Sequence, residues 1–139
     1  MNRGELQQLA EDRILDAAAL LSAGRWSEAY YPAGYAVECG LKACIMAYVE
    51  STGIIFEDKK FGEKCWTHDL DVLATLAGLG DALKTDREGN VALDDHWTLA
   101  KRWRGTSRYE QKTQVEAQRL HDAITNDPNG ILTWIRRRW

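Results

Sequence analysis

Five basic residues lie close together in the sequence, interleaved with aromatic residues. The basic residues are Lys101, Arg102, Arg104, Arg108 and Lys112, and the aromatic ones are Trp97, Trp103 and Tyr109. Guanidinium groups bind phosphates through paired hydrogen bonds, and aromatic rings stack on nucleobases. The pattern predicts a phosphate or nucleic-acid site, with candidate residues Lys101, Arg104, Arg108, Tyr109 and Lys112.

The same residues also have a structural interpretation. Trp97 and Trp103 lie at core spacing in a helical pattern, so we expect both to be buried. Arg108 and Tyr109 precede a predicted helix, and helix N-termini attract anions, which makes these two the better binding candidates. The favoured interpretation of Arg108 is nevertheless structural, with its side chain bonding to carbonyl groups or to Glu38 across the bundle.

A second charged group lies inside the apolar stretch GYAVECGLKACIMAYVE, where Glu38 precedes Lys42 by one helical turn. This order is the favourable one for an ion pair within a helix. The favoured interpretation is a partly solvated pair at the edge of the apolar stripe. The alternative is a pair at the seam of the bundle or of a dimer, where it would fix the register of the helices.

The cysteines and histidines do not form a metal-binding pattern. Cys65 and His68 have a C-x2-H spacing, but zinc normally needs four ligands, and Cys39 and Cys44 are unsuitably spaced on a helix. We therefore expect no metal and no cofactor. Three cysteines are an odd number without framework spacing, which predicts a reducing, cytoplasmic location.

Charge is distributed unevenly along the chain. Residues 101–139 hold nine Lys/Arg and four Asp/Glu (+5), whereas residues 1–100 hold nine and seventeen (−8). The split indicates either an anion-binding face or two surfaces that attract each other in a dimer. The N-terminus lacks an apolar run of signal-peptide length, and no stretch approaches the roughly 20 apolar residues that span a membrane, so we expect no membrane contact.

Length and periodicity predict one all-α domain over residues 1–139, an up-and-down bundle of five to six helices. Apolar residues make up 45% of the chain and only two residues are proline, a composition typical of a helical globular domain. The predicted helices cover residues 5–23, 27–51, 67–77, 93–104, 110–125 and 128–139. The stretches 53–66 and 84–90 are predicted to be loops, the first with an extended piece at residues 54–56.

Several residues are predicted to begin or shape these helices. Ser27, Thr67 and Asp127 are the N-cap candidates, and Gly24 is the predicted left-handed end of the first helix. Gly34 and Gly40 are poor helix formers, so we expect a neighbouring helix to approach closely where they lie. The first two helices are expected to form an antiparallel hairpin because their connection is short.

The order of three motifs resembles the HEPN superfamily (higher eukaryotes and prokaryotes nucleotide-binding domain). The motifs are YYPAGYAVECGLKACI on the second helix, THDLDVL at the start of the third, and WRGTSRY before a later long helix. The resemblance implies a helical bundle that is usually a homodimer. It also implies either metal-independent ribonuclease activity or non-catalytic binding of nucleotide, nucleic acid or a nucleotidyltransferase partner, often in toxin–antitoxin or defence systems.

Catalytic HEPN members carry an arginine that is followed, after four to six residues, by a histidine. No arginine lies five to seven positions before His68, His96 or His121. The resemblance therefore favours a non-catalytic binding module for nucleotide, RNA or a nucleotidyltransferase. The alternatives are a ribonuclease with a rearranged site, using Arg108 with His121 or His96, and an antitoxin-like protein-interaction domain. The favoured hypothesis also predicts that the basic residues lie at the accessible edge of the bundle, with no histidine imidazole beside them.

Overall fold

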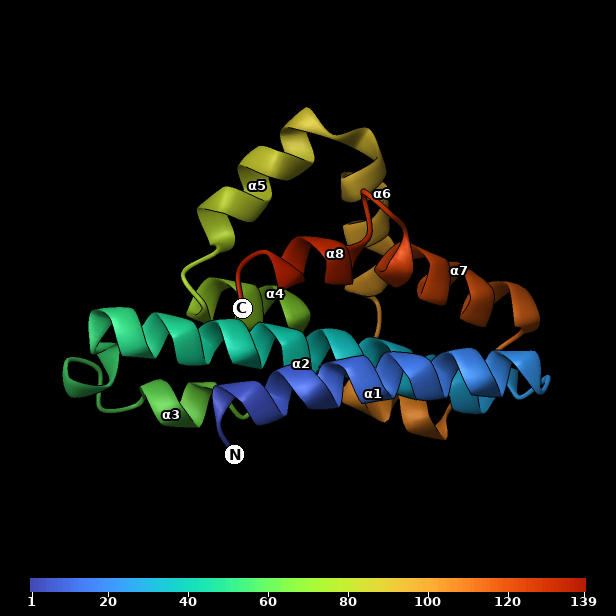
Figure 1. Ribbon diagram of the computed structural model, residues 1–139, viewed down its shortest axis with the longest axis horizontal. Helices are drawn as coiled ribbons and strands as arrows, with labels where there is room; N and C mark the ends of the chain where they lie inside the picture. Colours follow the sequence, from blue (N-terminus) through green and yellow to red (C-terminus); the bar gives the residue numbers. More distant parts are fainter.

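A computed structural model describes all 139 residues of the chain and contains helices but no strands (Figure 1). This confirms the predicted all-α bundle, although the number of α-helices is eight instead of the predicted five to six. The α-helices are α1 (Arg3–Ser22), α2 (Trp26–Thr52), α3 (Phe61–Lys64), α4 (Leu70–Leu76), α5 (Gly80–Gly89), α6 (Val91–Ala100), α7 (Gln114–Thr125) and α8 (Ile131–Arg136). Two short 3-10 helices, η1 (Ile54–Phe56) and η2 (Gly105–Tyr109), complete the fold. No helix combines the length and hydropathy that crossing a bilayer requires.

The first two helices form the predicted antiparallel hairpin (Figure 1). Asn2 and Glu5 cap α1 reciprocally, each side chain accepting a hydrogen bond from the other residue's backbone N–H. The apolar stripe of α1 faces α2 and buries Leu6, Ala10, Ile14, Ala17 and Leu21. Gly24 adopts the predicted left-handed conformation, with φ of 75°. This reversal returns the chain along α1.

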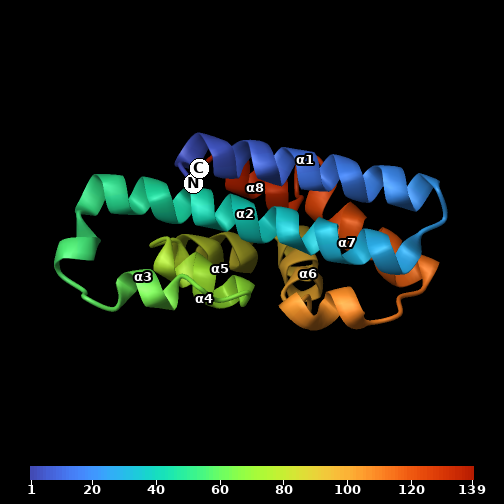
Figure 2. The ribbon, with the colours of Figure 1, turned by 90° about the horizontal axis from the view of Figure 1, so that it is seen from below.

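Helix α2 is the central element and contacts α1, α4, α7, α8 and η2 (Figures 1 and 2). Its two interior glycines allow close approach, as predicted. A Cβ atom at Gly34 would lie 2.2 Å from the Trp103 ring, and one at Gly40 would lie 2.9 Å from Ile135 Cγ2. The glycines therefore place an indole and helix α8 directly against the backbone of α2.

The segment after α2 is more helical than the sequence predicted. Gly53 ends α2 in a left-handed conformation, with φ of 65°. Residues 54–56 then form the 3-10 helix η1 instead of an extended piece, and Phe61 to Lys64 form the single turn α3. The buried Phe61 ring holds this segment on the core.

The expected loop over residues 84–90 is also wrong, because it forms the second half of α5. Its polar composition reflects an exposed helix attached through few contacts. Leu83 is its buried residue, and Asp86 accepts a hydrogen bond from the Trp134 indole at 2.8 Å. Arg87 Nε lies 2.7 Å from Asp94 of α6. Tertiary contacts thus stabilise a helix that lacks an apolar stripe of its own.

None of the three predicted N-caps, Ser27, Thr67 and Asp127, caps its helix. Helix α2 begins at Trp26, so Ser27 lies inside its first turn. Helix α4 is capped by Asp69, whose Oδ1 accepts from the Val72 N–H at 3.1 Å, rather than by Thr67. Helix α7 begins at Gln114 with Thr113 as its cap, so Glu110 lies outside it. Helix α8 begins at Ile131 after Gly130, which leaves Asp127 and Pro128 in the connection.

Buried aromatic residues follow the prediction more closely. Trp97 and Trp103 are both in the core, although Trp103 lies beyond the end of α6. Of the apolar positions predicted for α7, Leu120 and Ile124 are buried, but Val115 is 64% exposed. Val115 lies five positions before Leu120, which is about 140° around the helix, so its side chain faces solvent.

Candidate nucleic-acid interface

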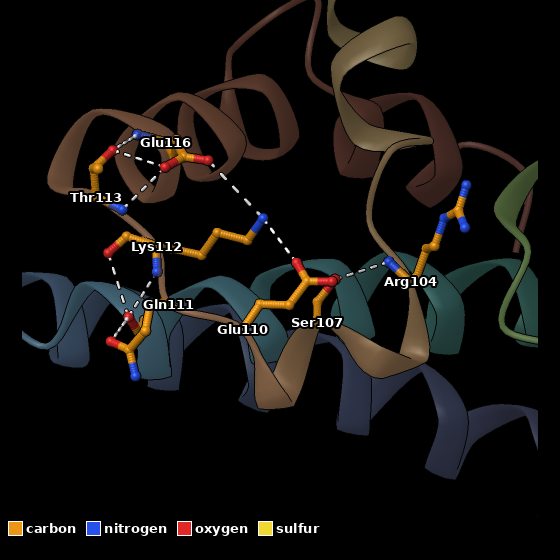
Figure 3. A network of polar contacts seen from close by, with 8 residues as sticks. Arg104, Ser107, Glu110, Gln111, Lys112, Thr113 and Glu116 are labelled. Atoms are coloured by element: carbon orange, nitrogen blue, oxygen red, sulfur yellow. Dashed lines mark hydrogen bonds and ion pairs between the residues drawn. The ribbon is translucent and has the colours of Figure 1, made fainter.

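Residues 104–112 are fastened onto the N-terminal part of α2 (Figure 3). At one end, the buried Ser107 hydroxyl accepts a hydrogen bond from the Arg104 N–H at 3.0 Å. At the other end, Ser27 Oγ accepts from the Lys112 N–H at 2.8 Å. Ser27 lies in the first turn of α2, so it fastens this segment instead of capping the helix. The η2 segment therefore presents its side chains from a fixed backbone.

Four side chains on this surface form a stack, which we call the aromatic ladder: Tyr31, Tyr35, Arg108 and Tyr109. The Arg108 guanidinium carbon lies 4.9 Å from the centre of the Tyr109 ring and 6.0 Å from that of Tyr31. Tyr31 and Tyr35 are stacked, with ring centres 5.9 Å apart and an interplanar angle of 11°. These distances suit cation–π and offset stacking contacts. The structural interpretation of Arg108 required a bond to carbonyl groups or to Glu38. The structure contains neither bond.

The ladder is open to solvent and carries no negative charge of its own. Tyr109 is 75% exposed. Burial, with a smaller effect from the Cys39 thiol, raises the pKa of Tyr35 to about 12. Burial likewise raises the pKa of the Cys39 thiol to about 11. Both groups are uncharged near neutral pH, so they do not repel a phosphate.

Two further candidates, from the same basic segment of the chain, are cations without an acidic partner. Lys101 and Arg104 are exposed, and neither forms an ion pair within 4.0 Å. In Figure 3 the Arg104 guanidinium points away from the network that holds its backbone. These residues are therefore available to an incoming anion.

Lys112 is not available in the same way. Its ammonium lies 3.0 Å from Glu110, 3.9 Å from Glu116 and 4.4 Å from the centre of the Tyr30 ring. The hydrogen bond that Lys112 donates to Glu110 raises the pKa of Lys112, and burial opposes this effect. Figure 3 shows the lysine bridging the two carboxylates. The role of Lys112 is thus to fix the segment before α7.

The Glu38–Lys42 pair is present, but the favoured interpretation of a partly solvated pair is wrong for Glu38. Only 1% of the Glu38 side chain is exposed, and Lys42 Nζ lies 2.9 Å from its Oε1. The charge is tolerated because a third group joins it. His68 Nδ1 lies 3.0 Å and 2.9 Å from the two carboxylate oxygens. We call Glu38, Lys42 and His68 the carboxylate cluster.

His68 connects the carboxylate cluster to η2. A Cβ atom at Gly105 would lie 2.7 Å from His68 Cδ2, so the imidazole packs on the start of η2. Because Glu38 accepts from Nδ1–H, Nε2 is the acceptor of a neutral ring, on a side chain that is 56% exposed. Sequence reasoning placed His68 in a helical turn and missed this role, since its partner is 30 positions away.

The other two histidines do not pair with Arg108, whose guanidinium lies in the aromatic ladder. His96 lines a groove of about 420 Å³ between α6 and α7 together with Arg102 and Arg119, and with Asp95 and Asp122. Its Nδ1 donates a hydrogen bond to the Asn129 carbonyl at 2.7 Å, so Nε2 is the acceptor when the ring is neutral. The expected absence of an imidazole beside the cationic residues is therefore wrong.

His121 is half-buried and has no hydrogen-bond partner at Nδ1. Burial lowers the pKa of His121, and Asp122 partly opposes the effect. The residue is therefore uncharged near neutral pH. It contributes little to a cationic surface.

No group of three metal-binding side chains occurs in the structure. The Cys65 thiol donates to the Phe61 carbonyl at 3.2 Å, and all three cysteines are free. Arg136 forms two hydrogen bonds of 2.7 Å with Glu11, and Arg138 bonds to Asp86 at 3.0 Å. These two C-terminal arginines therefore make tertiary contacts that stabilise the fold.

The structure thus brings Arg108 and Tyr109 together with Tyr31 and Tyr35, which sequence reasoning did not single out. Their only sequence signal is an aromatic pair at i,i+4 spacing on α2. Comparison of the chain with known protein families, with curated proteins and with solved structures gave no match.

Proposed function

We propose that this chain is a HEPN-like, non-catalytic module that binds single-stranded RNA or nucleotides on the aromatic ladder. One observation carries the proposal: a guanidinium lies over two tyrosine rings, one of them 75% exposed. Its expected setting is a cytoplasmic homodimer, since the resemblance implies a dimer and the three cysteines are free thiols.

Bases and phosphates would use different parts of this surface. A base stacking on the open side of Tyr109 extends the ladder by one ring, which is worth about 1–3 kcal/mol per base. Arg104 and Lys101 then meet the phosphates of the same strand through charge-assisted hydrogen bonds. Sequence preference should be weak, because every base has a stacking face.

Fluorescence anisotropy with a short labelled single-stranded RNA tests this function. We expect saturable binding at low ionic strength that weakens as salt rises, because phosphate contacts release counterions. Tyr109→Ala should weaken binding about 5- to 100-fold. Val115→Ala is the matched control, because it removes an equally exposed apolar side chain from α7. Absence of binding at low salt, or equal losses in the two variants, would refute the proposal.

His68 supports a second candidate function, a ribonuclease with a rearranged site. Glu38 holds Nδ1 of the imidazole, which leaves Nε2 as the acceptor of a neutral ring, and the ring packs on Gly105, directly after Arg104. Nε2 would take the proton from a ribose 2′-OH, and that oxygen would attack phosphorus as the bond to the 5′-oxygen breaks. The 5′-oxygen would take its proton from water. The products would be a 2′,3′-cyclic phosphate and a 5′-hydroxyl.

RNA cleavage in the presence of a chelator separates the two candidates. A catalytic His68 predicts that His68→Ala abolishes cleavage but leaves RNA affinity intact. The binding proposal predicts no cleavage by the unmodified protein. The nucleotidyltransferase partner implied by the HEPN resemblance, in a toxin–antitoxin or defence system, stays a prediction that co-purification would test.

A further inference from the structure

Large apolar side chains are exposed on one surface at the far end of α2 from the ladder. Phe56 is 93% exposed, Trp66 is 88% exposed and Ile55 is 49% exposed. All three belong to the connection from α2 to α4, which Figure 2 shows at the opposite end of the molecule from the α1–α2 turn. We call this connection, residues 53–66, the apolar end.

An apolar groove lies beside these side chains. Its volume is about 320 Å³, and its residues come from α1, α2 and the apolar end itself. Leu6, Ile45, Met46, Val49 and Phe61 contribute to its walls, together with Ile55 and Trp66. Methionine adapts readily to an inserted ring. Exposed rings and an empty apolar groove thus share one surface.

We propose that a second copy of this chain covers this surface, with Phe56 of each copy inserted into the groove of the other. A projecting ring and a receiving groove on the same surface are what a two-fold, self-complementary interface requires. This inference rests on the homodimeric part of the proposed function and is independent of RNA binding.

The area is sufficient for such a dimer. An aromatic side chain buries about 150–250 Å². The four rings, Phe56 and Trp66 of both copies, would remove roughly 600–1,000 Å² from water. The other groove walls and the charged rim would bring the total toward the roughly 1,200–2,000 Å² of a specific protein interface. The rings would form the apolar centre of this interface.

Charges around the apolar end also fit a second copy better than a polyanion or an anionic membrane. Residues 57–64 hold three acidic and three basic residues, so their net charge is zero. Asp58 and Lys64 already pair at 2.8 Å. Glu57, Lys59, Lys60 and Glu63 remain, two of each sign, and can pair across a two-fold axis as a polar rim.

Sedimentation velocity over a range of concentrations tests the proposal. We expect the unmodified protein to be a dimer at micromolar concentration. Phe56→Ser should raise the dimer dissociation constant by about 100-fold or more, because the two-fold axis removes the ring twice. Trp66→Ser should raise it less. Since both rings are exposed in one copy, neither change should alter the helical circular dichroism or the melting temperature of the monomer.

Tyr109→Ser is the matched control, because it removes a similarly exposed ring from the ladder. It should leave the dimer intact while weakening RNA binding, whereas Phe56→Ser should do the reverse. A monomeric unmodified protein at every concentration would overturn the proposal, as would a dimer unaffected by Phe56→Ser. Either result would leave the RNA-binding proposal standing, so the two can fail separately.

Discussion

The basic residues at 101–108 and those at 136–138 look alike in the sequence but differ in their surroundings. In the first cluster, Lys101, Arg104 and Arg108 have no carboxylate partner, and Arg108 lies over two tyrosine rings. In the second, Arg136 is bound to Glu11 and Arg138 to Asp86, which leaves only Arg137 without an ion-pair partner. A run of arginines is therefore a candidate site only where the fold leaves its guanidinium groups without acidic neighbours.

The side chains of the first cluster are held in place by the packing of η2 on α2. The carboxylate cluster contributes to this packing, because His68 bonds to Glu38 of α2 and contacts Gly105 of η2. Glu38→Ala should lower the free energy of unfolding by about 2–3 kcal/mol, because it leaves Lys42 and His68 without their buried acceptor. Both partners are partly exposed and can regain water, which limits the loss. Urea denaturation measures it. Glu50→Ala, which removes an exposed partner of Arg3, should change stability by less than about 0.5 kcal/mol.

Within the second cluster, Arg138→Ala should cost about 1–2 kcal/mol of stability and leave RNA affinity unchanged. The guanidinium lies 3.8 Å from the centre of the Trp134 ring and bonds to Asp86 and to the Trp134 carbonyl. Thermal denaturation and RNA titration of the same preparation check both parts. Weaker RNA binding by a variant that is still folded would remove the distinction between the clusters.

Gly105→Ala tests whether the position of His68 against η2 matters for the function of the first cluster. The added methyl group would meet the imidazole and displace it from η2. Because the obstructing atoms belong to a partly exposed side chain that can move, we expect a loss of stability of only about 1 kcal/mol. If His68 is catalytic, cleavage should fall while RNA affinity is kept. Gly62→Ala is the control, since nothing lies near a Cβ atom there.

The smallest expected effect concerns pH. Because the pKa of Tyr35 is about 12, this phenol stays neutral in the folded protein from pH 7 to 9. RNA affinity measured at constant ionic strength should therefore stay constant across that window. A steady weakening between these values would show that a group on the ladder gains negative charge.

Much of the fold could be predicted because the long helices carry clear apolar periodicity. The α1–α2 hairpin, its glycine turn and the close contacts at Gly34 and Gly40 all followed from local patterns. Helix α5 could not be predicted in the same way, since its stability comes from Leu83 and from contacts with Trp134 and Arg138. Propensity describes a segment alone and omits such partners.

The candidate site was predicted in part for a similar reason. Arg108 and Tyr109 were identified because charge and aromatic character are local properties of the sequence. Tyr31 stacks with a residue about eighty positions away, and Glu38 bonds to His68 across 30 positions, so neither contact has a local signal. The same limitation made Lys112 look free when Glu110, Glu116 and Tyr30 already surround it.

RNA titration of Arg108→Ala and Arg136→Ala, measured side by side with their unfolding curves, tests the central claim most directly. Arg108→Ala should weaken RNA binding about 5- to 100-fold with little change in stability, because the side chain joins the ladder at the surface. Arg136→Ala should leave RNA affinity unchanged and lower stability by less than about 1 kcal/mol. Equal losses of RNA affinity in both variants, or none in either, would contradict the account.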